Sequence, residues 1–299
     1  MVKTAARRSV AVIGAGRLGG AFGRLLAQAG YRVVAVAGRT RRSAAAGARF
    51  IGAGEATADA VAAAARAAIV LITVPDREIR GVCERIARGG ALRRGTLVAH
   101  ASGAHTRELL DAARAAGALR AVLHPLQAVP TRERGVAHIP GSFFRIEADR
   151  GARARVSALV RALGGIELSL PGWTGEPRSA ALYHAGAVAA SNYLVTLLDF
   201  AARLLGTLGV DRRLALRAVL PLVRGTLANV EGLGIPAALT GPIARGDAAT
   251  VAGHVAALRQ RAPELLALYR LLARETVPLA RAKGLDGAAA DALLRIVRE

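Results

Sequence analysis

The feature that most constrains this chain is a glycine-rich turn between an apolar strand and a helix. The apolar run Val10–Ile13 is followed directly by Gly14–Gly19, with the sequence GAGRLG, and then by a helical pattern. In such a turn Gly14 allows the tight bend, Gly16 lets a pyrophosphate approach the backbone, and Gly19 lets the helix pack closely on the strand. The chain has 34 glycines, so an ordinary turn is the alternative. The position between strand and helix predicts a dinucleotide-binding βαβ unit.

The end of the second predicted strand indicates which dinucleotide binds. An NAD site usually places a carboxylate about 20 residues beyond the glycines, to bind the ribose 2′-hydroxyl. Here the strand is followed by Gly38-Arg39-Thr40-Arg41-Arg42, which contains no acid. Guanidinium groups and a hydroxyl suit a 2′-phosphate, so NADP(H) is favoured over NAD. The alternative is one more solvent-facing arginine cluster. The predicted cofactor residues are Gly14, Gly16, Arg17, Leu18, Gly19, Arg39, Thr40, Arg42, Val74 and Pro75.

Strand and helix patterns divide the 299 residues into two domains. Short β-branched runs alternate with alanine-rich helices up to about Ile146, which predicts an α/β domain with a doubly wound parallel sheet of Rossmann type. After Leu170 only helical patterns follow. We expect a Rossmann domain over residues 1–170 and an all-helical domain over 171–299, linked by Leu170–Pro177. The predicted strands are Ser9–Ile13, Arg32–Ala37, Ile69–Thr73, Thr96–His100, Ala121–Leu123 and Ser142–Ile146.

The formal net charge of +21 would by itself suggest a polyanion partner. All basic residues except Lys3 and Lys283 are arginines scattered singly along helices, and no aromatic residues interleave them to stack bases. This distribution favours a solvated surface over nucleic acid. One cysteine, Cys83, excludes a thiolate metal cluster and an internal disulfide, so no metal is predicted and a cytoplasmic location is expected. Ala180–Ala202 contains too many polar groups for a lipid-facing span, which predicts a buried helix and no membrane partner.

Polar residues follow several predicted strands at the edge where ligands bind in open α/β sheets. Val74-Pro75 ends one strand, Ser102 follows another, and His124 follows the next. For His124 a structural role in fixing the loop is the alternative to contacting substrate. His184 and Asn192 lie on the helix that opens the second domain, about 12 Å apart along its axis. They would touch opposite ends of one substrate, or else be satisfied buried polar groups.

The chain resembles the 6-phosphogluconate-dehydrogenase-like superfamily, which includes ketopantoate reductase, 3-hydroxyisobutyrate dehydrogenase and pyrroline-5-carboxylate reductase. Within it the closest resemblance is to a family of Rossmann-like proteins with a helical C-terminal domain of unknown function. The strings that carry the resemblance span nearly the whole chain: Gly14–Gly19, Val74–Asp76, His100–Ala104, His124–Gln127, Tyr183–Ala185, Ala190–Tyr193 and Leu239–Asp247.

The resemblance implies a pyridine-nucleotide oxidoreductase whose substrate binds against the first long helix, and a homodimer formed through the helical domain. Related dehydrogenases carry a catalytic lysine four residues before the asparagine of that helix, but Val188 stands four before Asn192. Lysine is therefore excluded as the proton donor. The predicted catalytic residues are His184 as proton source, with Asn192 and Ser102 orienting the substrate. Thr240 and Arg245 are predicted to hold a substrate carboxylate, and His124 to contact the substrate; the alternative for Arg245 is a network at the N-terminus of the helix that begins at Ala248.

Three functions follow. The first is an NADP-dependent oxidoreductase that transfers a hydride between NADPH and a small, anionic carbonyl, imine or hydroxyacid. The second is a non-catalytic NADP(H)-binding regulatory or scaffold protein, since the lysine is absent. The third, nucleic-acid binding through the net charge, is disfavoured and predicts affinity that falls steeply with salt.

Overall fold

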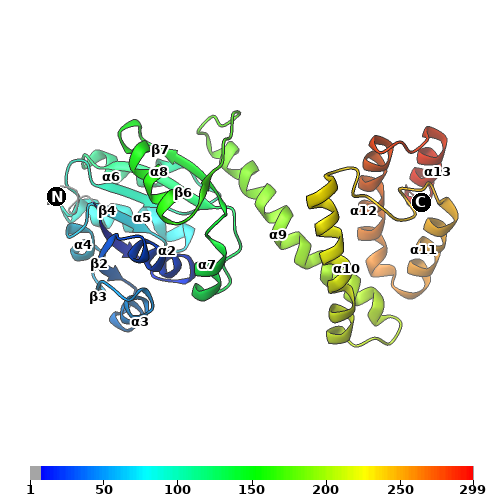
Figure 1. Cartoon of the computed structure of the whole chain (residues 1–299), viewed down its shortest axis with the longest axis horizontal. Coiled ribbons are helices and arrows are strands. Elements are labelled where there is room, and N and C mark those ends of the chain that lie inside the picture. The colour runs from blue at the N-terminus through cyan, green and yellow to red at the C-terminus, as the bar shows by residue number, and fades with distance from the viewer. Residues whose placement is uncertain (1–7, 299) are drawn as a thin grey trace. The chain divides into compact units, whose positions relative to one another are not determined.

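The computed structural model describes residues 8–298. It forms two compact units, which meet between Ala189 and Ala190 inside one long helix. The first unit contains one eight-stranded sheet in the order β3-β2-β1-β4-β5-β6-β7-β8 (Figure 1). The strands are β1 (Ser9–Ile13), β2 (Arg32–Ala37), β3 (Glu55–Thr57), β4 (Ile69–Ile72), β5 (Leu97–His100), β6 (Leu119–Pro125), β7 (Phe143–Ala148) and β8 (Ile166–Glu167).

The predicted α/β class is confirmed, with the sheet parallel from β3 through β6 and β7 antiparallel to β6. Each predicted strand is present within two residues at either end. The prediction missed β3 and β8, which contain three and two residues. Both lie at the edges of the sheet, where so short a segment carries no readable alternation.

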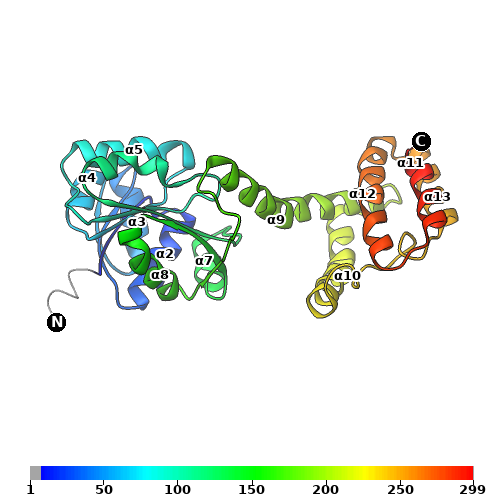
Figure 2. The same cartoon turned by 90° about the horizontal axis from the view of Figure 1, so that it is seen from above.

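Helices cover both faces of the sheet, as Figure 2 shows with α4 and α5 on one face and α2, α3, α7 and α8 on the other. Alternation along β1 explains this, because Val10 and Val12 enter one apolar core while Ala11 and Ile13 enter the other. The helices are α2 (Arg17–Gln28), α3 (Arg41–Ile51), α4 (Ala60–Ala65), α5 (Asp76–Arg88), α6 (Asp111–Ala115), α7 (Arg132–His138) and α8 (Arg153–Ala162).

The second unit contains helices joined by turns, with no strand among its described residues. It holds the end of α9 (Pro177–Gly206), then α10 (Arg212–Leu233), α11 (Ala248–Arg261), α12 (Pro263–Ala282) and α13 (Gly287–Arg298). Small apolar clusters join α11, α12 and α13, with Phe200 of α9 in one of them. Asp247 caps α11 by accepting a hydrogen bond from the Thr250 amide at 3.0 Å, as its position before Ala248 predicts.

The expectation that Ala180–Ala202 is a buried helix is wrong for the single chain. Within α9 only Ala180, Phe200 and Ala202 are buried, and the Leu182 side chain is 75% exposed. Its apolar residues lack neighbours in the described chain because few other elements pack along it. Among the described residues α9 is the one helix whose length and composition would allow it to cross a membrane. That is a weak indication, since the core helix of a soluble protein passes the same test.

Candidate functional site

The glycine-rich turn follows β1 and opens α2. Gly14 adopts a φ of +95°, and its N–H donates to the Ala37 carbonyl at 2.8 Å. A Cβ on Gly19 would lie 2.2 Å from Thr73 Oγ1 and 2.3 Å from the Gly14 carbonyl oxygen, whereas nothing lies within 4 Å of the same position on Gly16. The helix is therefore packed tightly at Gly19, and the backbone is open at Gly16 where a pyrophosphate would approach.

Arg132, at the start of α7, stabilises the glycine-rich turn through hydrogen bonds. Its Nη2 donates to the Ala15 carbonyl at 2.6 Å and its Nε donates to the Gly16 carbonyl at 3.1 Å. Sequence reasoning missed Arg132, because it lies more than 100 residues from the turn in a chain rich in arginine. Its position brings a positive charge beside the turn that would hold the cofactor's diphosphate.

The turn after β2 presents the residues predicted to select the cofactor. Thr40 caps α3, since its hydroxyl accepts from the Ser43 amide at 3.1 Å. Arg39 and Arg42 are exposed on either side of it. Thr40 therefore fixes the turn, and the two guanidinium groups remain as the candidates for a 2′-phosphate.

Polar side chains gather beyond the carboxyl ends of β4 and β5. The Ser102 hydroxyl donates to Asp76 Oδ2 at 2.8 Å, and the Ser102 amide donates to His100 Nδ1 at 3.1 Å. His100 Nε2 lies 2.9 Å from the Thr106 carbonyl oxygen. Because its amide and hydroxyl are both engaged, Ser102 is held in one orientation. Asp76 is the partner that sequence reasoning did not assign.

His124 and Tyr183 form the centre of the candidate site. His124 Nδ1 lies 2.9 Å from the Tyr183 hydroxyl, and the two rings meet edge to face. The His184 ring is 6.3 Å from that of His124. A Cβ on Gly103 would lie 2.7 Å from both His124 Nε2 and His184 Cδ2, so only glycine fits between these imidazoles. The predicted residues His124 and His184 thus lie together, with Tyr183 added.

Arg145 places a buried positive charge behind this pair. Its Nη2 donates to the carbonyls of Ser102 and His105 at 3.0 and 2.8 Å, and its side chain is 1% exposed. The guanidinium carbon lies 4.6 Å from the ring centre of Trp173 and 5.4 Å from that of Tyr183. A sequence signal that could have identified Arg145 is its position inside the apolar run of residues 143–146, two residues before the acidic Glu147 with which it pairs at 3.5 Å.

Burial keeps both members of the His124–Tyr183 pair neutral; the Arg145 charge adds to this effect at His124 and opposes it at Tyr183. Desolvation first, and then the positive charge of Arg145, lower the pKa of His124 to about 3. Desolvation lowers the pKa of His100 to about 4. Burial raises the pKa of Tyr183 to about 12. Near neutral pH the site therefore holds neutral imidazoles and a protonated phenol beside a permanent cation.

The remaining predicted catalytic and substrate-binding residues lie in the second unit, whereas the predicted cofactor residues Arg17, Leu18, Val74 and Pro75 lie in the first. Asn192 is exposed on α9. Thr240 and Arg245 line a cavity of about 610 Å³ together with Lys283, whose Nζ donates to the Ala237 and Leu239 carbonyls. Their predicted roles toward substrate stay predictions. Among the described residues, no group of three or more His, Cys, Asp or Glu side chains is placed to hold a metal ion.

Comparison with known proteins finds a family model that matches each of the two parts of the chain. Residues 2–125 match the model of a Rossmann-like domain, and residues 142–276 match a domain of unknown function, DUF2520. No curated protein matches the chain.

Three solved structures share the fold. A proposed NADP oxidoreductase from Bacteroides fragilis is 24% identical with a TM-score of 0.71, over 90% of this chain and 98% of its own. A protein from Thermotoga maritima is 22% identical with a TM-score of 0.65, over 97% of this chain and 100% of its own. A pyrroline-5-carboxylate reductase from Coxiella burnetii is 16% identical with a TM-score of 0.56, over 97% of this chain and 96% of its own.

The two matched segments follow one another and cover most of the chain, and the family that the sequence resembles is confirmed. The chain therefore combines a segment that matches a Rossmann-like domain with a following segment that matches DUF2520, the combination that the sequence predicts.

Proposed function

We propose that the protein is an NADP(H)-dependent oxidoreductase that transfers a hydride between NADPH and a small anionic carbonyl, imine or hydroxyacid. The observation that carries this proposal is the His124–Tyr183 pair at the sheet edge that also bears the glycine-rich turn. The strands β1, β4, β5 and β6 are adjacent and parallel, so the loops that follow them border one crevice. The proposed activity of the Bacteroides fragilis neighbour and the reductase activity of the Coxiella burnetii neighbour support the same class.

The residues present fit a dinucleotide. The open backbone at Gly16 would receive the diphosphate, with Arg132 beside it, and Arg39 and Arg42 would contact a 2′-phosphate. When bound, NADPH supplies the hydride. The protein's own task is then to orient the substrate and to supply a proton where negative charge develops.

Tyr183 is the proposed proton donor. Its hydroxyl is protonated at neutral pH, and the neutral His124 imidazole beside it fixes its direction. An alkoxide formed by hydride addition is more basic than a phenolate, so transfer from Tyr183 to such an oxygen is downhill. His184 lies next to His124, where it would contact the substrate or return a proton from solvent. Arg145 forms an ion pair with the buried Glu147 carboxylate, at 3.5 Å, so its charge is largely compensated and the preference for an anionic substrate rests on the predicted roles of Thr240 and Arg245.

Cofactor binding is the first test, by calorimetric titration with NADPH and NADH. We expect NADPH to bind more tightly than NADH. Arg39→Ala should lower the affinity for NADPH by about tenfold and leave the affinity for NADH unchanged, because a charge-assisted hydrogen bond to the 2′-phosphate is lost. Arg49→Ala is the matched control, since Arg49 is exposed in the last turn of the same helix.

NADPH oxidation is then followed with panels of oxo acids, imines and, in reverse, hydroxyacids. Tight NADPH binding without turnover on any panel would favour the non-catalytic regulatory or scaffold role, which the absent lysine motivates. If neither NADPH nor NADH bound, both the oxidoreductase function and the non-catalytic regulatory or scaffold role would lose their basis.

We also propose that the chain forms a homodimer through α9 and α10. In α10, which has 22 residues, Ala215 is the one buried residue. An isolated amphipathic helix of this kind is marginal in water, so its apolar side chains require a partner. A second copy is the simplest occupant, because most soluble oligomers are symmetric homodimers. The large exposed apolar residues of these two helices within the second unit are Tyr193, Val195, Leu197, Leu214, Leu222, Leu227, Val230 and Leu233.

Replacing Leu222 by glutamate tests the dimer. Leu222 is 72% exposed in the single chain, and a charge there would be buried by a partner. We expect light scattering to give twice the chain mass for the wild type and the monomer mass for Leu222→Glu. The control Leu271→Glu, on α12, should leave the mass unchanged. A monomeric wild type would refute the proposal.

A further inference from the structure

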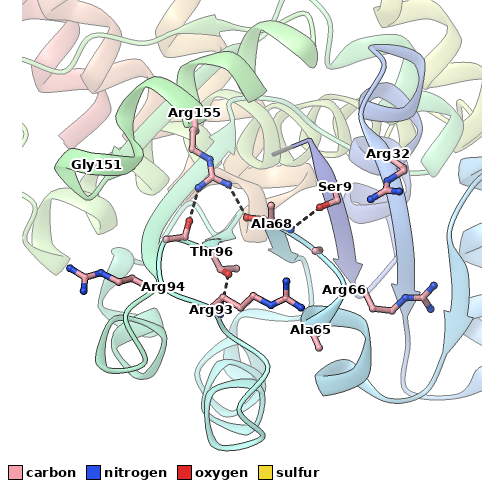
Figure 3. A pocket seen from close by; sticks show the side chains of 12 residues that line it. Ser9, Arg32, Ala65, Arg66, Ala68, Arg93, Arg94, Thr96, Gly151 and Arg155 are labelled. Atoms are coloured by element: carbon pink, nitrogen blue, oxygen red, sulfur yellow. Dashed lines mark hydrogen bonds between the residues drawn. The ribbon is translucent and has the colours of Figure 1, made fainter. Parts of the chain in front are cut away.

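A second cavity lies at the opposite edge of the sheet from the proposed cofactor site. It has a volume of about 610 Å³ and is bordered by the amino ends of β1, β2, β4 and β5 (Figure 3). Strand β1 has five residues, so roughly 16 Å separate its two ends. We call this cavity the amino-edge pocket. Its lining includes Arg32, Arg66, Arg93, Arg94 and Arg155 and contains no carboxylate side chain.

Two of these arginines have structural partners. Arg155 donates to the Gly95 carbonyl at 2.7 Å and to the Ala68 carbonyl at 2.8 Å, so it ties together the segments that enter β5 and β4. Arg66 forms an ion pair with Glu55. Figure 3 shows the Arg155 guanidinium directed at the pocket wall, which it helps to build.

The other three arginines have no such role. Arg32, Arg93 and Arg94 are exposed, and no ion pair joins any of them to a carboxylate within residues 8–298. These three arginines therefore line one cavity without a counter-charge from the described chain, and Figure 3 shows the Arg93 side chain extending into it while that of Arg94 extends away. Their mutual repulsion is a cost that an anionic ligand would remove.

Helix ends do not account for this arrangement. Basic residues are favoured at helix C-termini, and Arg66 occupies the C-cap position of α4. Arg32 opens a strand, however, while Arg93 and Arg94 lie beyond the end of α5 at Arg88. The three unpaired arginines are thus brought together by the sheet topology, because β2, β1, β4 and β5 are consecutive neighbours.

We propose that the amino-edge pocket binds a small phosphate-bearing polyanion with a diphosphate or triphosphate group. Planar guanidinium groups bind phosphate oxygens in pairs, and several arginines around one cavity match a ligand with several negative charges. The volume accommodates an inorganic triphosphate or a nucleoside triphosphate. Because the pocket lies at the other end of the strands, the protein could hold this ligand and NADPH together.

The experiment is a calorimetric titration of the full-length protein, saturated with NADPH, with inorganic triphosphate and with ATP at physiological salt. We expect one site per chain, and a loss of affinity of about tenfold or more in the double variant Arg32→Gln/Arg93→Gln, since each guanidinium contributes charge-assisted hydrogen bonds. The matched control is Arg213→Gln/Arg217→Gln on α10, which should bind as the wild type does. If ATP binds more tightly than inorganic triphosphate, the ligand is a nucleotide. If the two affinities are equal, the pocket recognises the phosphate chain alone.

Two outcomes would overturn the proposal. Equal weakening by the double variant and the α10 control, or several sites per chain, would show general attraction to a basic protein. Binding of a single-stranded oligonucleotide that depends on Arg32 and Arg93, with no binding of triphosphate or ATP, would assign the pocket to nucleic acid instead. Circular dichroism of each variant checks the fold, which the exposed positions of Arg32 and Arg93 should leave intact.

Discussion

Gly16→Ala is expected to lower the affinity for NADPH by about 100-fold, or about 2.7 kcal/mol, while leaving the melting temperature close to that of the wild type. Nothing lies within 4 Å of a Cβ at Gly16, so the methyl group meets no other atom. The backbone there, with φ −70° and ψ −147°, lies outside the main regions of an L-residue, which costs about 1 kcal/mol and moves the melting temperature by only a few degrees. The same methyl group would occupy the space through which a diphosphate must approach the amides that open α2. Calorimetry and thermal unfolding of one variant measure the two effects.

Gly19→Ala is the control, because it should lower the stability of the fold first and the affinity for NADPH only as a consequence. Its Cβ would lie 2.3 Å from the Gly14 carbonyl oxygen and 2.2 Å from Thr73 Oγ1, so the backbone of the turn itself must move. We expect unfolding to become easier by about 1–3 kcal/mol, as overpacking usually costs, with NADPH binding lost as a consequence. If Gly16→Ala bound NADPH as tightly as the wild type, the turn would not be the cofactor site.

The sheet could be predicted because its signals are local. Each buried strand is a short β-branched run, and the glycine-rich turn fixes where the first βαβ unit begins. The same holds for the caps, since Asp247 and Asp211 each stand directly before a helical pattern and accept the amides of its first turn. Local patterns did not predict β3 and β8, because these strands are too short to show an alternation of apolar and polar residues.

The site could be predicted only in part, because its geometry comes from contacts distant in sequence. Ser102 lies two residues beyond β5, and His124 is the last residue but one of β6, so both stand at the carboxyl end of the sheet. Their roles toward a ligand stay predictions. Arg132 and Arg145 were missed, since nothing near either residue indicates the loop carbonyls that it binds. Tyr183 stands beside His184 in the sequence, yet its hydrogen bond to His124 depends on how α9 begins against the sheet.

The exposed apolar residues of α9 show a further limit. A helix that is apolar on most sides predicts burial, and the sequence does not say whether the same chain or another one supplies the cover. In the single chain α9 and α10 remain largely exposed, which is why the expected burial failed here and why a second copy is proposed.

Tyr183→Phe is expected to lower kcat by about 10²- to 10⁴-fold, the usual contribution of a positioned general acid, with any substrate that the panels identify. The substitution removes one hydroxyl and keeps the ring, which packs edge to face on His124 and lies 5.4 Å from the Arg145 guanidinium carbon. NADPH affinity should not change, because Tyr183 lies outside the glycine-rich turn and the arginines after β2. Steady-state rates and calorimetry of the same preparation separate the two effects.

The chain supplies a matched control for this variant. Tyr269 makes the same contact in the second unit, with its hydroxyl 2.8 Å from His254 Nδ1 and the rings 5.8 Å apart at 88°. Tyr269→Phe therefore removes an equivalent hydrogen bond without touching the candidate site. If Tyr183→Phe and Tyr269→Phe lowered kcat equally, the His124–Tyr183 pair would be a structural contact and Tyr183 would not be the proton donor.

The pH dependence gives an independent check on the same assignment. Burial raises the pKa of Tyr183 to about 12, while desolvation and Arg145 lower that of His124 to about 3. Neither group changes protonation between pH 5 and 9, so the ratio of wild-type to Tyr183→Phe rates should stay constant across that interval. A ratio that changed with pH inside that interval would show that Tyr183 is not the group that supplies the proton.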